Sequence, residues 1–281
     1  MAEYKDIHGT TIRNSAGNLS GAKTGELFYD STNRDFKYQH PNVTSAGAWR
    51  TSGSLNTGRA QLGGAGVSNS SGLVFGGTSD SALTESYDGS SWTEVGDLNS
   101  VRSRMGAAGA DNTSALSISG LPPPGGTVNV EQWDGSSWTE IANVNTSRWT
   151  LAANGTVTSA LAYGGKTPPT LYANTESWNG TAWTEVNDLN TARNELAGAG
   201  ASNSSALAFG GEAPPGFAAI TEDWTGVTWQ EVADLSTARD HLAGSGIITS
   251  ALASGGNTGS VSAATEEWNG TSNTTKTVDT D

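Results

Sequence analysis

A regular repeat of 43 to 46 residues is the strongest constraint on what this 281-residue chain can fold into. Five tryptophans recur at spacings of 43, 46, 45 and 46 residues, and an arginine follows each of them ten residues later. The tryptophans are Trp49, Trp92, Trp138, Trp183 and Trp229, and the arginines are Arg59, Arg102, Arg148, Arg193 and Arg239. Periods of this length are typical of radially arranged β-sheets, in which each repeat forms one small sheet.

Each repeat also contains two aromatic residues that flank a turn signal. The segments are YDGSSW from Tyr87, WDGSSW from Trp133, WNGTAW from Trp178 and WTGVTW from Trp224. Asn-Gly and Asp-Gly between strand-like residues favour tight hairpins, because both turn residues take positive φ. A loop of two or four residues places both rings on one sheet face, whereas a loop of three separates them. Rings that share a face need a neighbouring sheet to cover them.

The rest of each repeat supplies two more strands. The arginine is followed by a strand of small residues such as LAGAGASNS and then by an apolar strand such as SALAFGG. Glycine and alanine suit strands that crowd around a central axis. Glycine pairs end the apolar strand in four repeats, and Ser119-Gly120 replaces the pair in the fifth. We therefore expect four strands per repeat.

The Gly-Gly pair after an apolar strand, followed by spaced aromatic residues, resembles the kelch repeat. SALAFGG followed by TEDW and TW carries this resemblance, which extends over residues 49–270. Kelch repeats form β-propellers with one blade per repeat. The resemblance therefore implies an all-β fold, a five-bladed kelch-like β-propeller with a small N-terminal β-hairpin module. It implies no particular function, because one fold serves many.

The two ends of the repeat region complement each other. Trp49 has no small or apolar strand before it, and the last repeat ends in WNGTSN, with Asn273 where a second tryptophan is expected. We infer that residues 48–52 form the outer strand of the last blade and close the ring, so that the propeller spans 46–271. The alternative is that residues 275–280, within the C-terminal tail 272–281, fill that position.

Residues 1–45 lack the repeat and contain the strand-like segments LFYD and FKYQ around an Asn-containing turn. This pattern predicts a small hairpin module that acts as an anchor. A module of this kind, with the opening MAEYKDIHGT before glycine-rich kelch-like repeats, is similar to virion proteins of marine tailed phages. The resemblance implies a virion protein. Because the module lies outside the repeats, we expect residues 1–45 to bind other virion proteins, and we expect the protein to form a homo-oligomer.

The composition argues against several classes of partner. Twenty-eight acidic and fourteen basic residues give a formal net charge of −14, which opposes binding to nucleic acid. No run of 18 apolar residues and no apolar signal-peptide core are present, so we expect no membrane insertion. The absence of cysteine and the scattered positions of His8, His40 and His241 predict no metal site, and no cofactor is expected.

The sequence also argues against catalysis. Most carboxylates recur at equivalent positions in every repeat, whereas a catalytic pair is expected to break the repeat. Galactose oxidase carries a kelch-type propeller, but its copper chemistry requires a Tyr-Cys crosslink, and this chain has no cysteine. No G-x-S-x-G motif precedes a predicted helix. We expect no catalytic residues and no enzymatic activity.

The recurrent arginines and tryptophans each allow two interpretations. The arginines form a cationic ring at one mouth of the propeller, or they pair with the glutamates that follow 26 to 29 residues later, and we favour pairing. Those glutamates are Glu85, Glu131, Glu176, Glu222 and Glu266. The tryptophans form a platform for sugar rings, or they fill the core between blades, and we favour the core.

The loop after the second strand of each repeat varies most. It contains stiff and partly apolar residues that lose little entropy on binding, and it emerges on the propeller face that carries the arginine loops. The candidate partner-binding residues are Pro122, Pro123, Pro168, Pro169, Tyr172, Pro214, Pro215 and Phe217. Drift in solvent-exposed loops is the alternative explanation.

Together these features predict a non-enzymatic structural and interaction protein located on the virion. It would be a phage tail fibre, appendage or decoration component, with the propeller displayed for host attachment or assembly. A host surface glycan or protein is the expected partner of the displayed face. The alternative is a secreted or surface carbohydrate-binding or carbohydrate-active kelch protein.

Overall fold

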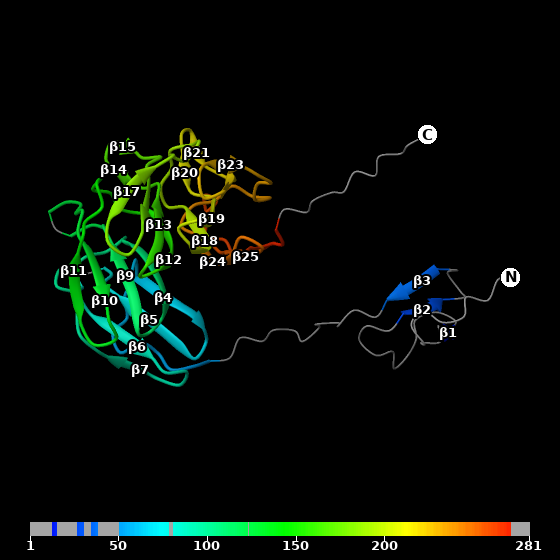
Figure 1. Cartoon of the computed structure of the whole chain (residues 1–281), viewed down its shortest axis with the longest axis horizontal. Helices are drawn as coiled ribbons and strands as arrows, with labels where there is room; N and C mark the ends of the chain where they lie inside the picture. Colours follow the sequence, from blue (N-terminus) through cyan, green and yellow to red (C-terminus); the bar gives the residue numbers. More distant parts are fainter. Residues whose placement is uncertain are drawn as a thin grey trace. The chain divides into compact units, whose positions relative to one another are not determined.

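The computed structural model describes residues 13–15, 27–30, 35–38, 51–78, 81–122 and 124–270 (Figure 1). The chain divides into two compact units, Met1–Thr51 and Ser52–Asp281. Every regular element in the described residues is a β-strand, so the all-β expectation is confirmed. The described part contains no helix long and apolar enough to cross a bilayer.

The N-terminal unit contains one three-stranded sheet. Its strands are β1 (Arg13–Ser15), β2 (Leu27–Asp30) and β3 (Asp35–Tyr38). Strands β2 and β3 pair antiparallel, and β1 pairs parallel with β2. The first strand of the hairpin matches the expected LFYD, and the second begins at Asp35, one residue before the expected FKYQ.

The second unit is a five-bladed β-propeller, as predicted, with its blades following one another from cyan to orange in Figure 1. Blade 1 contains β4 (Gly63–Ser68), β5 (Ser71–Phe75), β6 (Thr84–Tyr87) and β7 (Trp92–Glu94). Blade 2 contains β8 (Gly106–Asp111), β9 (Ser114–Ile118), β10 (Val130–Trp133) and β11 (Trp138–Ile141). Blade 3 contains β12 (Ala152–Thr156), β13 (Ser159–Tyr163), β16 (Thr175–Trp178) and β17 (Trp183–Val186). Blade 4 contains β18 (Ala197–Ser202), β19 (Ser205–Phe209), β22 (Thr221–Trp224) and β23 (Trp229–Glu231).

Blade 5 has three strands among the described residues: β24 (Ala243–Ile247), β25 (Ser250–Ser254) and β26 (Thr265–Trp268). The two segments proposed for its fourth strand are residues 48–52 and 275–280. Of these, only residues 51 and 52 belong to the described part, and Trp49 lies outside it. Closure of the ring by either segment therefore stays a prediction.

Small residues allow the inner strands to approach each other at the centre. A Cβ placed on Gly109 of β8 would lie 2.8 Å from the Cβ of Ala65 on β4. A Cβ placed on Gly106 would lie 3.2 Å from the Cβ of Ala153 on β12. Since real Cβ atoms essentially never come within 3.0 Å of another atom, glycine at position 109 is needed for the contact between blades 1 and 2.

Each aromatic hairpin has a four-residue loop and directly opposed rings. Trp133 pairs with Trp138, and their ring centroids lie 5.6 Å apart. Trp178 pairs with Trp183 at 5.3 Å. Both rings of each pair therefore share one face of the blade, as the sequence predicts for a loop of this length.

The outer tryptophan of a blade packs against the preceding blade. Trp138 contacts the edge of Phe75 at a centroid distance of 4.8 Å, and its indole N–H donates to Oγ1 of Thr84 at 2.9 Å. Trp229 repeats both contacts with Tyr163 at 4.9 Å and Thr175 at 2.9 Å. The six hairpin tryptophans of blades 2 to 4 are only 1 to 7% exposed. They form the core between blades and leave no indole platform for sugars in these blades.

Candidate functional site

The recurrent arginines lie inside the blades, where each pairs with the glutamate of its own repeat. Arg193 lies 3.1 Å from Glu222, and neither side chain is exposed to solvent. The other pairs are Arg59–Glu85, Arg102–Glu131, Arg148–Glu176 and Arg239–Glu266. Burial lowers the pKa of the Arg193 guanidinium, and the neighbouring Glu222 acts in the opposite direction. All five arginines are buried structural residues and do not form a cationic surface.

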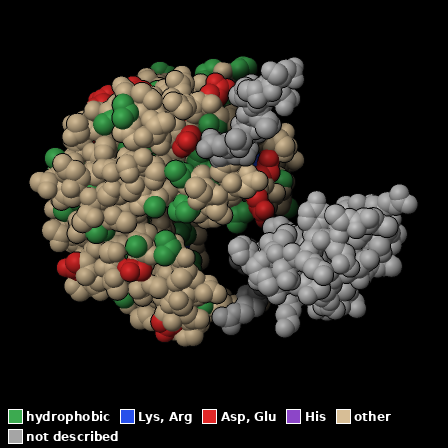
Figure 2. All heavy atoms as spheres, turned by 45° about the vertical axis from the view of Figure 1, so that its right-hand side comes forward, with side chains coloured by type: hydrophobic (Ala, Val, Ile, Leu, Met, Phe, Trp, Pro, Cys, Tyr) green, Lys and Arg blue, Asp and Glu red, His purple; other side chains and the backbone are tan. Residues whose placement is uncertain are grey.

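Each ion pair withdraws one cation and one anion from the surface, so the net charge is unchanged and acidic groups still outnumber basic ones among the remaining side chains. Figure 2 shows acidic side chains scattered over the propeller, with hardly any lysine or arginine visible on this face. The chain contains only 14 basic residues in total, against 28 acidic ones. An acidic surface repels phosphate backbones and therefore argues against a nucleic-acid interface.

The variable loops of blades 3 and 4 form short hairpins with exposed tips. One consists of β14 (Lys166–Thr167) and β15 (Thr170–Leu171), and the other of β20 (Glu212–Ala213) and β21 (Gly216–Phe217). The tips are Pro168-Pro169 and Pro214-Pro215, and both Pro-Pro peptide bonds are cis. Phe217 is exposed, whereas Pro122 and Tyr172 are half-buried, and Pro123 lies outside the described residues.

Backbone bridges connect these loops to the loops that carry the arginines. The residue after each arginine pairs with the start of the variable loop in four blades. The bridges are Ser103–Leu121, Trp149–Lys166, Asn194–Glu212 and Asp240–Asn257. The variable loops and the arginine loops therefore share one face of the propeller.

On this face, the second residue after each arginine lies at the mouth of the propeller. These mouth residues are Gln61, Arg104, Thr150, Glu195 and His241. In blades 2 to 5, the backbone N–H of the mouth residue donates to the carbonyl oxygen of the mouth residue in the preceding blade. The first of these bonds runs from Arg104 to Gln61 and the last from His241 to Glu195, both at 3.0 Å. The four bonds link all five blades in a continuous chain.

All five mouth residues have a left-handed backbone, with φ between 52° and 57°. This region is uncommon for residues other than glycine and is a true outlier for a β-branched residue such as Thr150. Glycine would adopt it without steric cost, and this chain places many of its 37 glycines at positive φ. The mouth instead carries five different polar side chains. Strained residues that persist in this way cluster at functional sites.

The mouth residues surround a pocket of about 510 Å³ on the propeller face. The next residue of each repeat forms its apolar collar, and these residues are Leu62, Met105, Leu151, Leu196 and Leu242. A volume of this size lies within the range of small-molecule sites, which typically combine an apolar lining with a few convergent polar groups. The pocket is therefore our candidate binding site.

Charged and neutral groups are interleaved around the pocket. Nε of Arg104 donates to Oε1 of Gln61 at 3.0 Å, and Nζ of Lys166 lies 3.2 Å from Oε1 of Glu195. Nδ1 of His241 lies 3.1 Å from both Oε2 of Glu195 and Oδ1 of Asp240. The site thus offers donors, acceptors and both signs of charge within one mouth, which suits a polar ligand or a polar protein segment.

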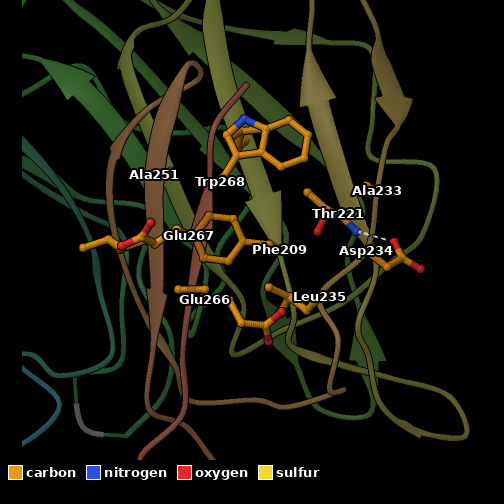
Figure 3. Close-up of a pocket in the computed structure, with 12 residues that line it drawn as sticks. Phe209, Thr221, Ala233, Asp234, Leu235, Ala251, Glu266, Glu267 and Trp268 are labelled. Atoms are coloured by element: carbon orange, nitrogen blue, oxygen red, sulfur yellow. Dashed lines mark hydrogen bonds between the residues drawn. The ribbon is translucent and has the colours of Figure 1, made fainter. Parts of the chain in front are cut away.

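A second pocket lies in the seam between blades 4 and 5, near β26 (Figure 3). Its lining includes Phe209, Thr221 and Trp268, which are equivalent to residues that surround the outer tryptophan at the other seams. Phe209 matches Phe75, and Thr221 matches Thr84. The residues that line this pocket are therefore those that would surround an outer tryptophan of blade 5.

Comparison with models of known protein families finds no match to this chain, and comparison with curated proteins finds none.

The mouth residues were missed by the sequence analysis, which predicted variation only in the longer loops. A signal was nevertheless present in the repeat alignment. Two positions lie between the constant arginine and an apolar residue, and the second of them contains Gln, Arg, Thr, Glu and His in successive repeats. A side chain that differs in every repeat, between flanking residues that recur, indicates a position that does not contribute to packing of the blade.

Proposed function

We propose that this protein is a non-enzymatic, kelch-like interaction protein that binds its partner with the propeller face formed by the mouth residues and the variable loops. The observation that supports this most strongly is the backbone strain at the mouth. Five chemically different polar side chains are kept at positions where glycine would relieve that strain. The exposed proline tips of the loops add stiff contact area on the same face at little entropic cost.

We further propose that the protein is a component of a phage particle. This part rests on the resemblance of the N-terminal opening and the glycine-rich repeats to phage fibre and appendage proteins. In this arrangement residues 1–45 bind other virion proteins, and the propeller, as part of a homo-oligomer, faces a host glycan or protein. The alternative is a secreted or surface carbohydrate-binding protein, which the polar rim and apolar collar of the mouth pocket would also suit.

Mass spectrometry of purified particles tests the assignment to the virion. We expect the protein at a fixed copy number per particle, and its absence from intact particles would exclude this part of the proposal. If the protein is absent from particles and binds glycans on an array through the mouth residues, the carbohydrate-binding alternative is supported.

Binding to host cells tests the choice of face. Fluorescently labelled full-length protein is compared with a variant in which Gln61, Thr150 and Glu195 are replaced by alanine. The matched control replaces Ser136, Thr181 and Thr228, which lie in the hairpin loops of the opposite face, by alanine. We expect the mouth variant to lose binding and the control to retain it, and equal binding of both variants would show that the mouth is not the contact surface.

A further inference from the structure

Three potential metal ligands meet where the mouths of blades 4 and 5 adjoin. Glu195 comes from blade 4, and the adjacent residues Asp240 and His241 come from blade 5. One ligand atom from each side chain lies within 4.8 Å of the others. Nδ1 of His241 is 3.1 Å from Oε2 of Glu195 and 3.1 Å from Oδ1 of Asp240.

Asp240 gives a second, independent indication of a ligand. The residue is only 4% exposed, and its Oδ1 accepts no hydrogen bond within the described part of the chain. A buried carboxylate oxygen that accepts no hydrogen bond is rare, because withdrawing it from water costs free energy that a hydrogen bond, an ion pair or a metal must offset. This oxygen faces the same ring nitrogen as Glu195 does. Two carboxylate oxygens and one imidazole nitrogen therefore converge on a single point, where a cation would be stabilised.

We propose that Glu195, Asp240 and His241 bind a divalent transition-metal ion, with Zn²⁺ the best match. Zinc takes nitrogen and carboxylate oxygen ligands at about 2.0–2.2 Å, so tetrahedral ligand atoms lie about 3.3–3.6 Å apart. The two distances of 3.1 Å need only a small outward movement of the side chains. Calcium requires six to eight oxygen ligands and fits this set poorly.

The backbone holds the ligands in place. The N–H of His241 donates to the carbonyl of Glu195 at 3.0 Å, which fixes the two strained residues relative to each other. Asp240 exchanges two backbone bonds with Asn257, at 3.1 and 2.9 Å. Lys166 contacts Oε1 of Glu195 and leaves Oε2 directed toward His241. Support of this kind orients metal ligands and strengthens binding.

The solvent side of the site is open, because the His241 side chain is 55% exposed. A fourth ligand, either water or a group from a partner, would complete a tetrahedral ion from that side. The ion would also join blade 4 to blade 5. The competing explanation is a protonated His241 that shares its charge with both carboxylates and binds no metal.

Isothermal titration of the full chain, after removal of metals with EDTA, decides between these explanations. We expect one equivalent of Zn²⁺ to bind saturably, with binding at least tenfold weaker for His241→Gln and for Glu195→Gln. The matched controls are His40→Gln, which removes a histidine elsewhere, and Thr150→Ala, which alters the equivalent mouth position of blade 3. Both controls should bind like the wild type, and Ca²⁺ should bind at least tenfold more weakly than Zn²⁺.

A wild-type protein that does not saturate with Zn²⁺, or a His241→Gln variant that binds as well as the wild type, would overturn the proposal. Circular dichroism melting of each variant without metal shows whether it is folded. Added Zn²⁺ should raise the melting temperature of the wild type and leave that of His241→Gln unchanged. These measurements use the isolated protein, so they are independent of the proposed partner and of the virion.

Discussion

The buried ion pairs show how one side chain can serve both a blade and the connection that enters it. Oε1 of Glu222 lies 3.1 Å from Arg193. Its Oε2 accepts the backbone and side-chain N–H groups of Asn190, both at 2.7 Å. Arg193 also donates to backbone carbonyls, including that of Ala208 at 3.1 Å. Each pair thus satisfies buried backbone groups at a position where water cannot reach.

Replacing Glu222 by glutamine tests this role. The change preserves shape but leaves the buried guanidinium of Arg193 without its countercharge, and breaking such a pair typically costs about 3–5 kcal/mol. We expect the free energy of unfolding, measured by chemical denaturation, to fall by that amount. Glu231→Gln, at an exposed position of the next strand, is the control and should change stability by no more than about 0.5 kcal/mol. Equal effects of the two changes would contradict a structural role for the pair.

The sequence predicted the residues of these pairs because arginine and glutamate recur in register, so one geometric solution must serve all repeats. It did not predict the mouth cluster, because the repeat alignment makes Glu195 and His241 equivalent but does not show that neighbouring blades bring their side chains together. The order of residues along the chain does not show that the imidazole of His241 faces two carboxylates. The three histidines lie far apart in the sequence, so His241 gave no indication of a metal site. Residues that recur in every repeat can be placed from the sequence, whereas contacts made in only one repeat are seen only in the structure.

At the level of the hairpin, an aspartate shapes the turn in two of the blades. Oδ1 of Asp134 accepts the N–H groups of Ser136 and Ser137, each at 2.8 Å, and the hydroxyl of Ser136 at 2.7 Å. Asp88 makes the same set of bonds in blade 1. The bonds are made to the charged carboxylate, and they lower the pKa of both residues from 3.8 to about 2.

These turns should therefore respond to acid. Because the pKa of Asp134 is depressed in the folded state, its stabilising effect is present above pH 3.8 and disappears as the pH falls towards about 2. An NMR titration of the side-chain carboxyl carbon should give a midpoint near 2 for Asp134. Asp134→Asn is the control: it removes the titration but should keep the turn, since Asn179 makes similar bonds to Thr181 and Ala182. A midpoint near 3.8 would show that the bonds do not persist in solution.

The aromatic pair on each hairpin provides the core of the seam. Trp178 is 2% exposed, packs against Trp183 and donates its indole N–H to the carbonyl of Val157 at 2.8 Å. Trp178→Ala should lower the free energy of unfolding by about 3–5 kcal/mol, as for other large core aromatics. Trp268, the equivalent residue of blade 5, is half-buried, so Trp268→Ala should cost less. An unchanged melting midpoint for Trp178→Ala would place this residue outside the cooperative core.

Over the whole propeller, blades 1 to 4 each pack one face against the following blade, whereas the corresponding face of blade 5 is largely exposed. Blades 1 to 4 each bury a leucine and a second large apolar residue against the following blade. The pairs are Leu73 and Phe75, Leu116 and Ile118, Leu161 and Tyr163, and Leu207 and Phe209. In blade 5 the equivalent residues are Leu252, which is 39% exposed, and Ser254. All five residues of β24 are exposed as well. Blade 5 is the least buried of the blades in the described part of the chain.

The chain that enters blade 1 nevertheless follows the pattern of the other junctions. A Cβ on Gly53 would meet the carbonyl oxygen of Ser90, as a Cβ on Gly96 would meet that of Ser136. The N–H of Asn56 donates to Glu85 at 2.7 Å, as that of Asn99 donates to Glu131. Residues 53–56 thus occupy the place that the chain takes after leaving the outer strand of a preceding blade. The assignment of residues 48–52 to the outer strand of blade 5 stays a prediction.

Paired deletions can establish which end of the chain closes the ring. If residues 48–52 complete blade 5 and Trp49 occupies the pocket formed by Phe209, Thr221 and Trp268, removing residues 46–53 empties that pocket and deletes the strand that would join blade 5 to the chain entering blade 1. We expect a larger radius of gyration in solution scattering and a lower melting temperature. Trp49→Ala should lower the melting temperature without changing the chain length.

Removal of residues 272–281 is the matched control, because it deletes the competing segment and keeps Trp49. We expect this variant to remain as compact and as stable as the full chain. The opposite pattern would assign the closing strand to residues 275–280. If both deletion variants stay compact, neither terminus closes the ring, and the three described strands of blade 5 suffice to hold it. The expected difference between the two deletions has a geometric basis. Phe209 and Thr221 line the pocket in the same way that Phe75 and Thr84 surround Trp138, so the strand that closes the ring should place an aromatic residue there.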